Sequence, residues 1–374
     1  MNKNNLELLH KDLFNQFGFN FGFVADLLEQ YLEDRNSVSE YWINYFDSIL
    51  KGNNGAIKGN TEKLLEQSSK SNFFKVYSAN YEFSDSDEKI PITGVGAKII
   101  ENMTGSLSIP TATSLRTISV KLLEENRRII NLHLKRTSGG KVSFTQIVAY
   151  AVVQAAKKYT NMNNSYGIFE NKPVLIKKNY INLGIAVDII RKDGTRSLIV
   201  PNIKDAGKMN FNIFLNAFNL TIEKSRTGKL EPSDFQGSTI TLTNPGGIGT
   251  VSSTPRLMTG QGSIIAVGAI DYPSEFKAMH ESALGSLGIG KVMNITSTYD
   301  HRIIQGAESG EFLGYIDKLL LGEENFYDSI FKDLLIPQKA VGWGLDTLSK
   351  RFVKIDNIEE IEKKARIFFL INML

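Results

Sequence analysis

The stretch Lys291–Leu320, KVMNITSTYDHRIIQGAESGEFLGYIDKLL, decides the fold, because it changes from strand periodicity to helix periodicity around a histidine. Residues 292–299 alternate β-branched and polar side chains, which predicts a strand with one polar face. From Ala307 onward apolar residues recur at helical spacing, which predicts an amphipathic helix. His301 therefore lies at the corner, where Gly306 is expected to allow a tight turn. A rigid strand beside an open loop suits a catalytic group.

Composition excludes several classes of function. The chain has 374 residues, of which 42% are hydrophobic, so it can bury a substantial core and is long enough for about two domains. Its net charge is only +3 and no basic block occurs, which excludes nucleic acid as the expected partner. Cysteine is absent and the four histidines are scattered, so we expect neither a thiol nucleophile nor a metal site.

The sequence shows no membrane signal. The N-terminus, MNKNNLELLHKDLF, has no apolar core of the kind found in signal peptides. No stretch of about 18 apolar residues occurs anywhere in the sequence. The sequence therefore predicts a cytoplasmic protein without a membrane partner.

Four regions follow one another along the chain. Residues 1–50 predict a short helical segment, with Ser37 and Glu40 as a capping box before an aromatic stripe. Because two short helices cannot bury a core alone, the stripe is expected to pack on this chain's own body or on another protein. Residues 51–90 are rich in Gly, Asn and Ser and predict a flexible linker. Residues 91–337 form the main domain, and residues 338–374 end in an apolar tail with no domain left to bury it.

The main domain alternates helices and strands, which predicts an α/β fold. Strands are expected at Thr111–Ser119, in INLGIAVDII and RSLIVPNI, which a turn at residues 192–194 would join, and in STITLTN and SIIAVGAI. Helices are expected from Leu122, at IVAYAVVQAAKKY after the capping box of Ser143 and Gln146, and from about Asn210 to Arg226. The second of these helices is apolar on nearly every side, so it belongs in the core.

Several runs in one order resemble the dihydrolipoyl acyltransferases, the second component of the 2-oxo acid dehydrogenase complexes. These runs are LGIAVDII, LIVPNIKDA, GKLEPSDFQGSTITLTNPGG and YDHRIIQG. The resemblance implies the chloramphenicol acetyltransferase-like fold, a two-layer α/β domain with a mixed sheet. A closer resemblance, carried by TGSLSIPTATSLR, NPGGIGTV, PRLMTGQGSII and TSTYDHRIIQGAESG, is to the acyltransferase-like part of multifunctional 2-oxoglutarate dehydrogenase/decarboxylase proteins of actinobacterial type.

Both flanks are similar to the same proteins. FVADLLEQYLEDRNSVSEYWINYFDSIL resembles the N-terminal docking segment of 2-oxoglutarate dehydrogenase subunits, and GWGLDTLSKRF resembles the entry to a thiamine-diphosphate-dependent domain. We therefore expect residues 338–374 to be the start of a truncated dehydrogenase domain, and the chain to be a fragment. The thiamine-binding motif does not occur, so no thiamine diphosphate site is expected within this chain.

The resemblance implies succinyl transfer from S-succinyldihydrolipoyl groups to coenzyme A in the tricarboxylic acid cycle. A thiol of pKa about 8.5 needs a base of pKa about 6 to 7 at neutral pH, and imidazole suits this task. His301 is the implied base, and Thr243 is the implied donor to the oxyanion, with Asn244 in support. In the family these groups come from neighbouring subunits, which implies a trimer. No lipoyl-domain motif occurs, so the lipoyl group would come from a lipoylated partner acyltransferase, beside components such as dihydrolipoamide dehydrogenase.

One position departs from the family pattern. Gln305 stands where most members have an aspartate that pairs with the neighbouring arginine, here Arg302. A neutral amide can accept a hydrogen bond from Arg302, but it should fix the loop less firmly. Arg256 is a further candidate, because a cation there would favour a substrate with a free carboxylate. A surface arginine is the ordinary alternative.

Three interpretations remain open from the sequence. The first is the succinyltransferase. The second is a catalytically silent trimeric scaffold, for which Gln305 would record lost catalysis. The third, acylation of a small molecule such as an antibiotic, shares the fold and the histidine but is disfavoured by the two flanking segments.

Overall fold

The computed structural model describes residues 20–56, 103–190 and 196–337, with single positions at 9, 12, 13, 16, 17, 86, 88 and 100. These residues fall into two compact units that divide near residue 102. Most of the predicted linker, the predicted turn at residues 192–194 and the predicted C-terminal segment lie outside the described residues. In the described part of the chain, no helix is long and apolar enough to cross a membrane.

The first unit contains α2 (Phe21–Glu33), the short 3-10 helix η2 (Arg35–Ser37) and α3 (Glu40–Ala56). The predicted aromatic stripe packs inside this unit, where Trp42 lies 5.9 Å from Phe17 and 5.3 Å from Phe46 between ring centroids. The prediction of a capping box at Ser37 is wrong. The Ser37 hydroxyl donates to backbone carbonyls of the preceding turns, and the first backbone bonds of α3 run to the carbonyl of Ser39.

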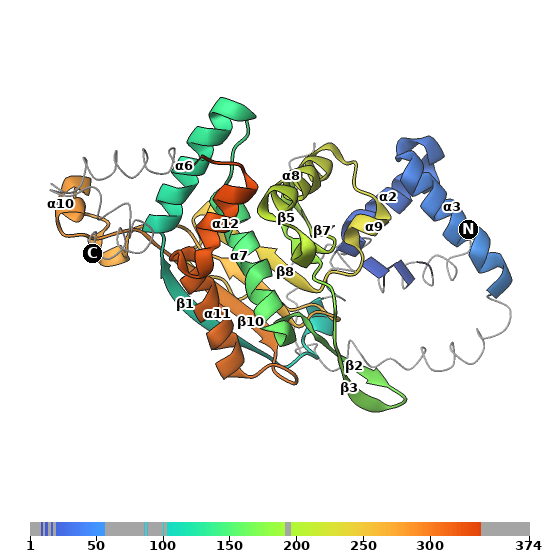
Figure 1. Ribbon diagram of the computed structural model, residues 1–374. Coiled ribbons are helices and arrows are strands. Elements are labelled where there is room, and N and C mark those ends of the chain that lie inside the picture. The colour runs from blue at the N-terminus through green and yellow to red at the C-terminus, as the bar shows by residue number, and fades with distance from the viewer. Residues whose placement is uncertain are drawn as a thin grey trace. The chain divides into compact units, whose positions relative to one another are not determined.

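The second unit is built on a six-stranded mixed sheet with the strand order β1-β10-β9-β8-β4-β7 (Figure 1). The central strands β9, β8 and β4 are parallel to one another, whereas β1, β10 and β7 pair antiparallel with their neighbours. The bounds are β1 (Thr111–Ser119), β4 (Leu183–Ile185), β7 (Asn202–Ile203), β8 (Ile240–Thr243), β9 (Ser263–Val267) and β10 (Val292–Asp300). The predicted α/β fold with a mixed sheet, preceded by helices, is confirmed.

Two hairpins stand apart from this sheet. They are β2 (Ser165–Phe169) with β3 (Lys172–Ile176), and β5 (Val187–Ile190) with β6 (Arg196–Ile199). The single strands predicted at INLGIAVDII and RSLIVPNI are therefore each divided in two. The break comes at Ala186, whose N–H turns to the carbonyl of Leu242, and at Pro201, which has no N–H to give to a ladder.

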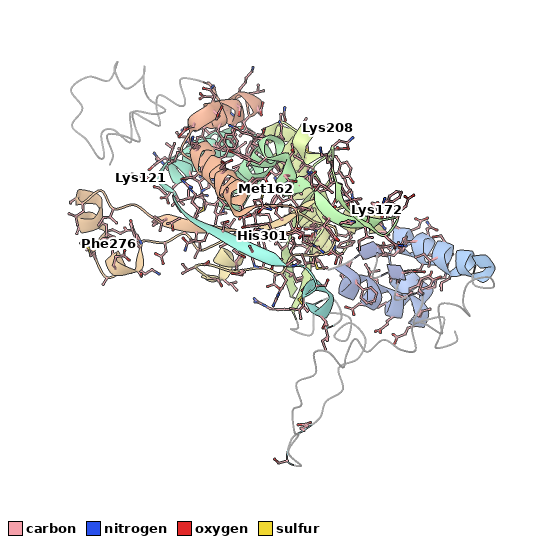
Figure 2. All side chains as sticks on the ribbon, turned by 90° about the horizontal axis from the view of Figure 1, so that it is seen from below. Lys121, Met162, Lys172, Lys208, Phe276 and His301 are labelled. Atoms are coloured by element: carbon pink, nitrogen blue, oxygen red, sulfur yellow. The ribbon has the colours of Figure 1, made fainter. Side chains whose placement is uncertain are left out.

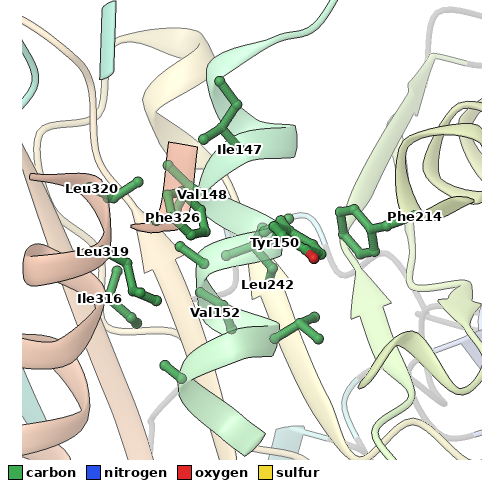
Figure 3. Close-up of a cluster of buried hydrophobic side chains, with 14 of the residues drawn as sticks. Ile147, Val148, Tyr150, Val152, Phe214, Leu242, Ile316, Leu319, Leu320 and Phe326 are labelled. Carbon is green, nitrogen blue, oxygen red and sulfur yellow. The ribbon is translucent and has the colours of Figure 1, made fainter. Parts of the chain in front are cut away.

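Helices α6, α8 and α11 pack against α7, which is buried along most of its length as predicted. The Ser143–Gln146 capping box at its start is present. Figure 3 shows Tyr150 of α7 between Phe214 and Phe326, with ring centroids 5.4 Å and 6.0 Å away. The helix bounds are α6 (Lys121–Thr137), α7 (Phe144–Lys158), η3 (Thr160–Asn163), η4 (Ala206–Lys208), α8 (Phe211–Thr227), α9 (Pro232–Phe235), η5 (Pro245–Ile248), η6 (Ser274–Phe276), α10 (Glu281–Ser286), α11 (Gly306–Leu320), η7 (Glu323–Asn325) and α12 (Phe326–Asp333).

Strand β10 has one apolar and one polar face, as the alternation predicted. Met293, Ile295 and Tyr299 of this strand belong to the apolar core shared with α7 and α11. Of its even-numbered residues, Thr296, Thr298 and Asp300 point to the opposite face of the sheet. There Thr298 is hydrogen-bonded to a threonine of β1 at 2.8 Å, and Thr296 to a backbone carbonyl at 2.7 Å. This buried but polar face of the sheet extends to the end of β10, and His301 is the next residue along the chain.

Candidate functional site

His301 occupies the centre of a turn that the side chain of Asp300 closes. An Asp300 carboxylate oxygen accepts the backbone N–H of Arg302 at 3.0 Å, and the Asp300 carbonyl accepts that of Ile304 at 3.0 Å. Asp300 is 2% exposed, so this carboxylate is held away from water. The preceding residue, Asp300, thus forms the turn that positions His301. Gly306, to which the sequence had assigned the turn, is instead the first residue of α11.

The Asp300 carboxylate is in turn held by the guanidinium of Arg302. Nε of Arg302 lies 2.9 Å from Oδ1 and its terminal nitrogen 2.6 Å from Oδ2, which is a two-pronged contact. Bonding to Asp300 raises the pKa of Arg302, although burial acts in the opposite direction. The guanidinium carbon also lies 3.8 Å from the centroid of the Tyr166 ring on β2. The side chains of Asp300, Arg302 and Tyr166 therefore contact one another in series beside the turn that carries His301.

Two further contacts fix the backbone of the turn. The N–H of His301 donates to the carbonyl of Pro110, immediately before β1, at 2.9 Å, and Figure 2 shows the labelled His301 beside this strand. The side-chain amide of Asn161 donates to the carbonyl of Ile303 at 2.7 Å and to the Glu308 carboxylate in the first turn of α11 at 2.9 Å. The turn is anchored on both sides of the histidine.

The imidazole itself is exposed, in contrast to the buried residue that precedes it. Its ring lies 5.5 Å from the ring of Tyr299 at an interplanar angle of 63°. Within the described residues, neither ring nitrogen of His301 is hydrogen-bonded. The ring can therefore accept a proton from a bound group without first breaking a contact inside its own protomer.

Thr243 is the last residue of β8, directly before the glycine corner. No hydrogen bond engages its hydroxyl within the described part of the chain. Asn244, the neighbour given a supporting role, donates from its amide to the hydroxyl of Thr145 at 2.7 Å. A side chain at Gly246 would lie 2.3 Å from the backbone of Gly268, so only glycine permits this close approach of the corner to the strand end. The corner holds Thr243 at a defined strand end.

Thr243 and His301 lie at opposite ends of the sheet within one protomer. Thr243 is in register with Ala266 of β9, and Ala266 with Thr296 of β10. His301 follows Thr296 by five residues, or about 16 Å of strand, and two strand spacings add about 10 Å sideways. The separation within one protomer is thus about 19 Å. One chain does not bring these two candidate groups together.

The segment 251–262 crosses the polar face of the sheet between these two ends. Its start is fixed near the Thr243 end, where the N–H of Ala269 donates to the carbonyl of Thr250. Leu257 packs on Ile264 further along, and the Gly262 carbonyl accepts the N–H of Asp300 at 3.0 Å. Arg256 is exposed on this segment, next to Leu257. It therefore lies on the same polar side of the sheet as Thr243.

Gln305 differs from its expected role. It is the N-cap residue of α11, but its side chain makes no capping hydrogen bond. Arg302, its expected partner, is bound to Asp300 instead. Although residue 305 is not an aspartate, Arg302 is still held, because the carboxylate of Asp300 binds its guanidinium.

Two residues of this arrangement could not have been chosen from the sequence. Tyr166 and Asn161 precede the turn by more than a hundred residues, and no local pattern marks them. The Asp300–Arg302 contact, by contrast, has a local signal, since an aspartate two residues before a backbone N–H commonly closes such a turn. In the described residues, no cluster of three or more His, Asp or Glu side chains could hold a metal ion.

Comparison with known proteins gives two family matches. Residues 84–326 match the family described as 2-oxoacid dehydrogenases acyltransferase (catalytic domain), and residues 16–53 match the 2-oxoglutarate dehydrogenase N-terminus. The multifunctional 2-oxoglutarate metabolism enzyme of Mycolicibacterium vanbaalenii is 50% identical over 289 residues, which is 77% of this chain and 22% of that protein. The 2-oxoglutarate dehydrogenase E1/E2 component of Corynebacterium glutamicum is 51% identical over 256 residues, 68% of this chain and 21% of that protein. The chain thus spans about a fifth of these relatives.

Solved structures agree with these matches. A probable dihydrolipoamide acetyltransferase from Listeria monocytogenes superposes with a TM-score of 0.54 at 26% identity, covering 65% of this chain and 98% of that one. The truncated catalytic core of the 2-oxoacid dehydrogenase multienzyme complex from Thermoplasma acidophilum gives 0.51 at 28% identity, covering 63% and 98%. The second unit therefore has the fold of these catalytic cores.

Proposed function

Because the chain belongs to the 2-oxoacid dehydrogenase acyltransferase family, we propose that it transfers a succinyl group from an S-succinyldihydrolipoyl group to coenzyme A. The observation that carries the proposal is the turn at the end of β10, where hydrogen bonds on both sides of the exposed His301 fix the backbone. The choice of succinyl rests on the relatives, whose names place them in 2-oxoglutarate metabolism.

His301 would act first as a base. Its neutral imidazole takes the proton of the coenzyme A thiol, and the thiolate sulfur attacks the carbonyl carbon of the succinyl thioester. A bond from carbon to the new sulfur forms, and the carbonyl electrons move onto oxygen. The hydroxyl of Thr243 donates to that oxyanion, which stabilises the charge as it develops. Collapse breaks the bond to the dihydrolipoyl sulfur, which receives the proton back from the imidazolium.

This reaction needs two copies of the chain. The two groups lie about 19 Å apart in one protomer, too far to act on one carbonyl carbon. We therefore infer that His301 of one protomer faces Thr243 of its neighbour, and that a closed trimer would build each site from two protomers. A ring with the same contact repeated is the ordinary closure of such a head-to-tail interface.

The substrates would reach this site from other proteins. We infer that the succinyl group arrives on the lipoylated domain of a partner acyltransferase, and that a dihydrolipoamide dehydrogenase reoxidises the product. Arg256 would attract the free carboxylate of the succinyl group, since it is exposed on the segment that crosses the polar face. Residues 1–50 would dock the chain to other components, through the part that matches the 2-oxoglutarate dehydrogenase N-terminus.

A direct assay tests the proposal. Purified chain is supplied with S-succinyldihydrolipoamide and coenzyme A, and succinyl-coenzyme A is measured, with the mass of the assembly recorded in parallel. We expect transfer by the wild type and its loss in His301→Ala, with an unchanged mass. His133→Ala is the matched control, because His133 lies on α6, is only half-buried and has no part in the turn.

The scaffold interpretation makes the opposite prediction. It draws on one observation, the neutral side chain of Gln305, which makes no capping hydrogen bond at the start of α11. A silent scaffold would assemble to the same mass, bind no coenzyme A and transfer nothing. A wild-type chain that assembles but is as inactive as His301→Ala would therefore replace the transferase proposal with the scaffold.

A further inference from the structure

We propose that Tyr166 is a positioning residue for His301, acting through Arg302 and Asp300. The inference rests on the proposed function, in which His301 is the base. It assigns a role to the β2–β3 hairpin, which pairs with no other strand of the described sheet.

Three contacts in series connect the hairpin to the turn that carries the imidazole. The Tyr166 ring faces the guanidinium of Arg302 at 3.8 Å, and this guanidinium grips both carboxylate oxygens of Asp300. Asp300 then closes the turn whose central residue is His301. Each contact restrains the next group, so a change at the ring is transmitted to the backbone on either side of the histidine.

The ring matters because the outer side of the Arg302 guanidinium is open to water. Its side chain is 32% exposed, whereas that of Asp300 is 3% exposed. Water therefore competes for the guanidinium on its outer side, and a flat aromatic surface at van der Waals distance excludes that water and opposes rotation of the arginine. Without the ring, the exposed arginine would sample other rotamers and leave the carboxylate held only by the backbone.

The residue at 305 makes this support necessary. A neutral Gln305 offers no charge to Arg302, so the arginine has one carboxylate partner in the turn rather than two. The ring of Tyr166 covers the remaining side of the Arg302 guanidinium. The hairpin thus supplies, from a distant part of the chain, the fixing that a second carboxylate would otherwise give.

Four proteins test the proposal: wild type, Tyr166→Leu, Tyr166→Phe and Phe169→Leu. The phenylalanine variant keeps the ring and removes only the hydroxyl. Phe169→Leu makes the same aromatic-to-leucine change on the same strand at a side chain that is 65% exposed. For each protein, kcat, KM for both substrates, the thermal midpoint and the hydrogen exchange of the amides of residues 300–305 are measured.

We expect Tyr166→Leu to lower kcat about tenfold and to leave both KM values within about twofold, because misplacement of a catalytic group slows chemistry without removing substrate contacts. Exchange of the His301 and Arg302 amides should rise about fivefold, the ratio that corresponds to about 1 kcal/mol. Tyr166→Phe and Phe169→Leu should match the wild type in both measurements.

Each other outcome overturns the proposal. An unchanged kcat and unchanged exchange in Tyr166→Leu would show that the ring does not hold the turn. Equal losses in Phe169→Leu, or a lower thermal midpoint alone, would show a structural role for the hairpin. If the wild type transfers no succinyl group, the proposed function fails, but the exchange rates still decide whether Tyr166 orders the turn.

Discussion

A methyl group added at Gly262 should disturb both the turn that carries His301 and the stability of the fold. An ideal Cβ at this position lies 2.1 Å from the carbonyl oxygen of Asn164 and 3.1 Å from that of Met162. A carbon–oxygen contact is ordinarily about 3.3 Å or longer, so the two segments must separate by more than about 1 Å. Both obstacles are backbone atoms, which cannot rotate away as a side chain would.

The separation acts on two hydrogen bonds. The Gly262 carbonyl accepts the N–H of Asp300, and the adjacent Ser263 hydroxyl donates to Met162 at 2.7 Å. Overpacking costs about 1–3 kcal/mol and a weakened buried hydrogen bond about 1 kcal/mol more. Gly262→Ala should therefore lower the free energy of unfolding by about 2–4 kcal/mol. Displacement of Asp300 by about 1 Å should reduce kcat on the order of a hundredfold.

The matched control is Gly310→Ala in the interior of α11, where an added Cβ meets nothing within 4 Å. The same chemical change there should stabilise the protein by about 0.5–1 kcal/mol, because alanine favours a helix over glycine. Urea unfolding at a fixed protomer concentration measures both variants, since assembly makes stability depend on concentration. Equal stability and activity in the two variants would refute this account of the turn.

Three further predictions concern single positions. Thr243→Val should lower kcat about a hundredfold with little change in either KM, while Thr243→Ser keeps the hydroxyl and most of the rate; equal rates would remove Thr243 from the mechanism. Arg256→Ala should raise KM for the succinyl donor and not for an acetyl donor, whereas a parallel change for both donors would make it an ordinary surface residue. Ser143→Ala should lower the unfolding free energy by about 1 kcal/mol through loss of the cap of α7, and a chemical denaturation curve identical to that of the wild type would contradict this.

The sequence predicted those elements whose pattern is local. Helix α7 is apolar on nearly every side and begins with a serine and a glutamine three residues apart, and both features are found as predicted. The change of periodicity around His301 likewise placed the corner between β10 and α11. Patterns of this kind depend only on neighbouring residues, so the elements that they indicate can be predicted from the sequence.

Two kinds of element failed, those that depend on distant partners and one local cap. INLGIAVDII has one uninterrupted strand pattern, yet residues 183–185 pair with β7 and β8 and residues 187–190 pair with β6. The predicted cap at Ser37 failed for a local reason, because its hydroxyl donates to carbonyls of the preceding turns. The contact of Tyr166 with Arg302 joins segments that only the folded chain brings together. The sequence therefore predicted the position of the histidine but not the side chains that hold the turn around it.

The central claim is that each site combines His301 of one protomer with Thr243 of another. The most direct test mixes two inactive proteins, His301→Ala and Thr243→Val, by coexpression or by refolding together in equal amounts. In a randomly mixed trimer, about a quarter of the sites receive an intact histidine and an intact threonine from neighbouring protomers. The account predicts recovery of about a quarter of the wild-type succinyl transfer. Activity no greater than that of the two separate variants, in assemblies shown to be mixed, would contradict it.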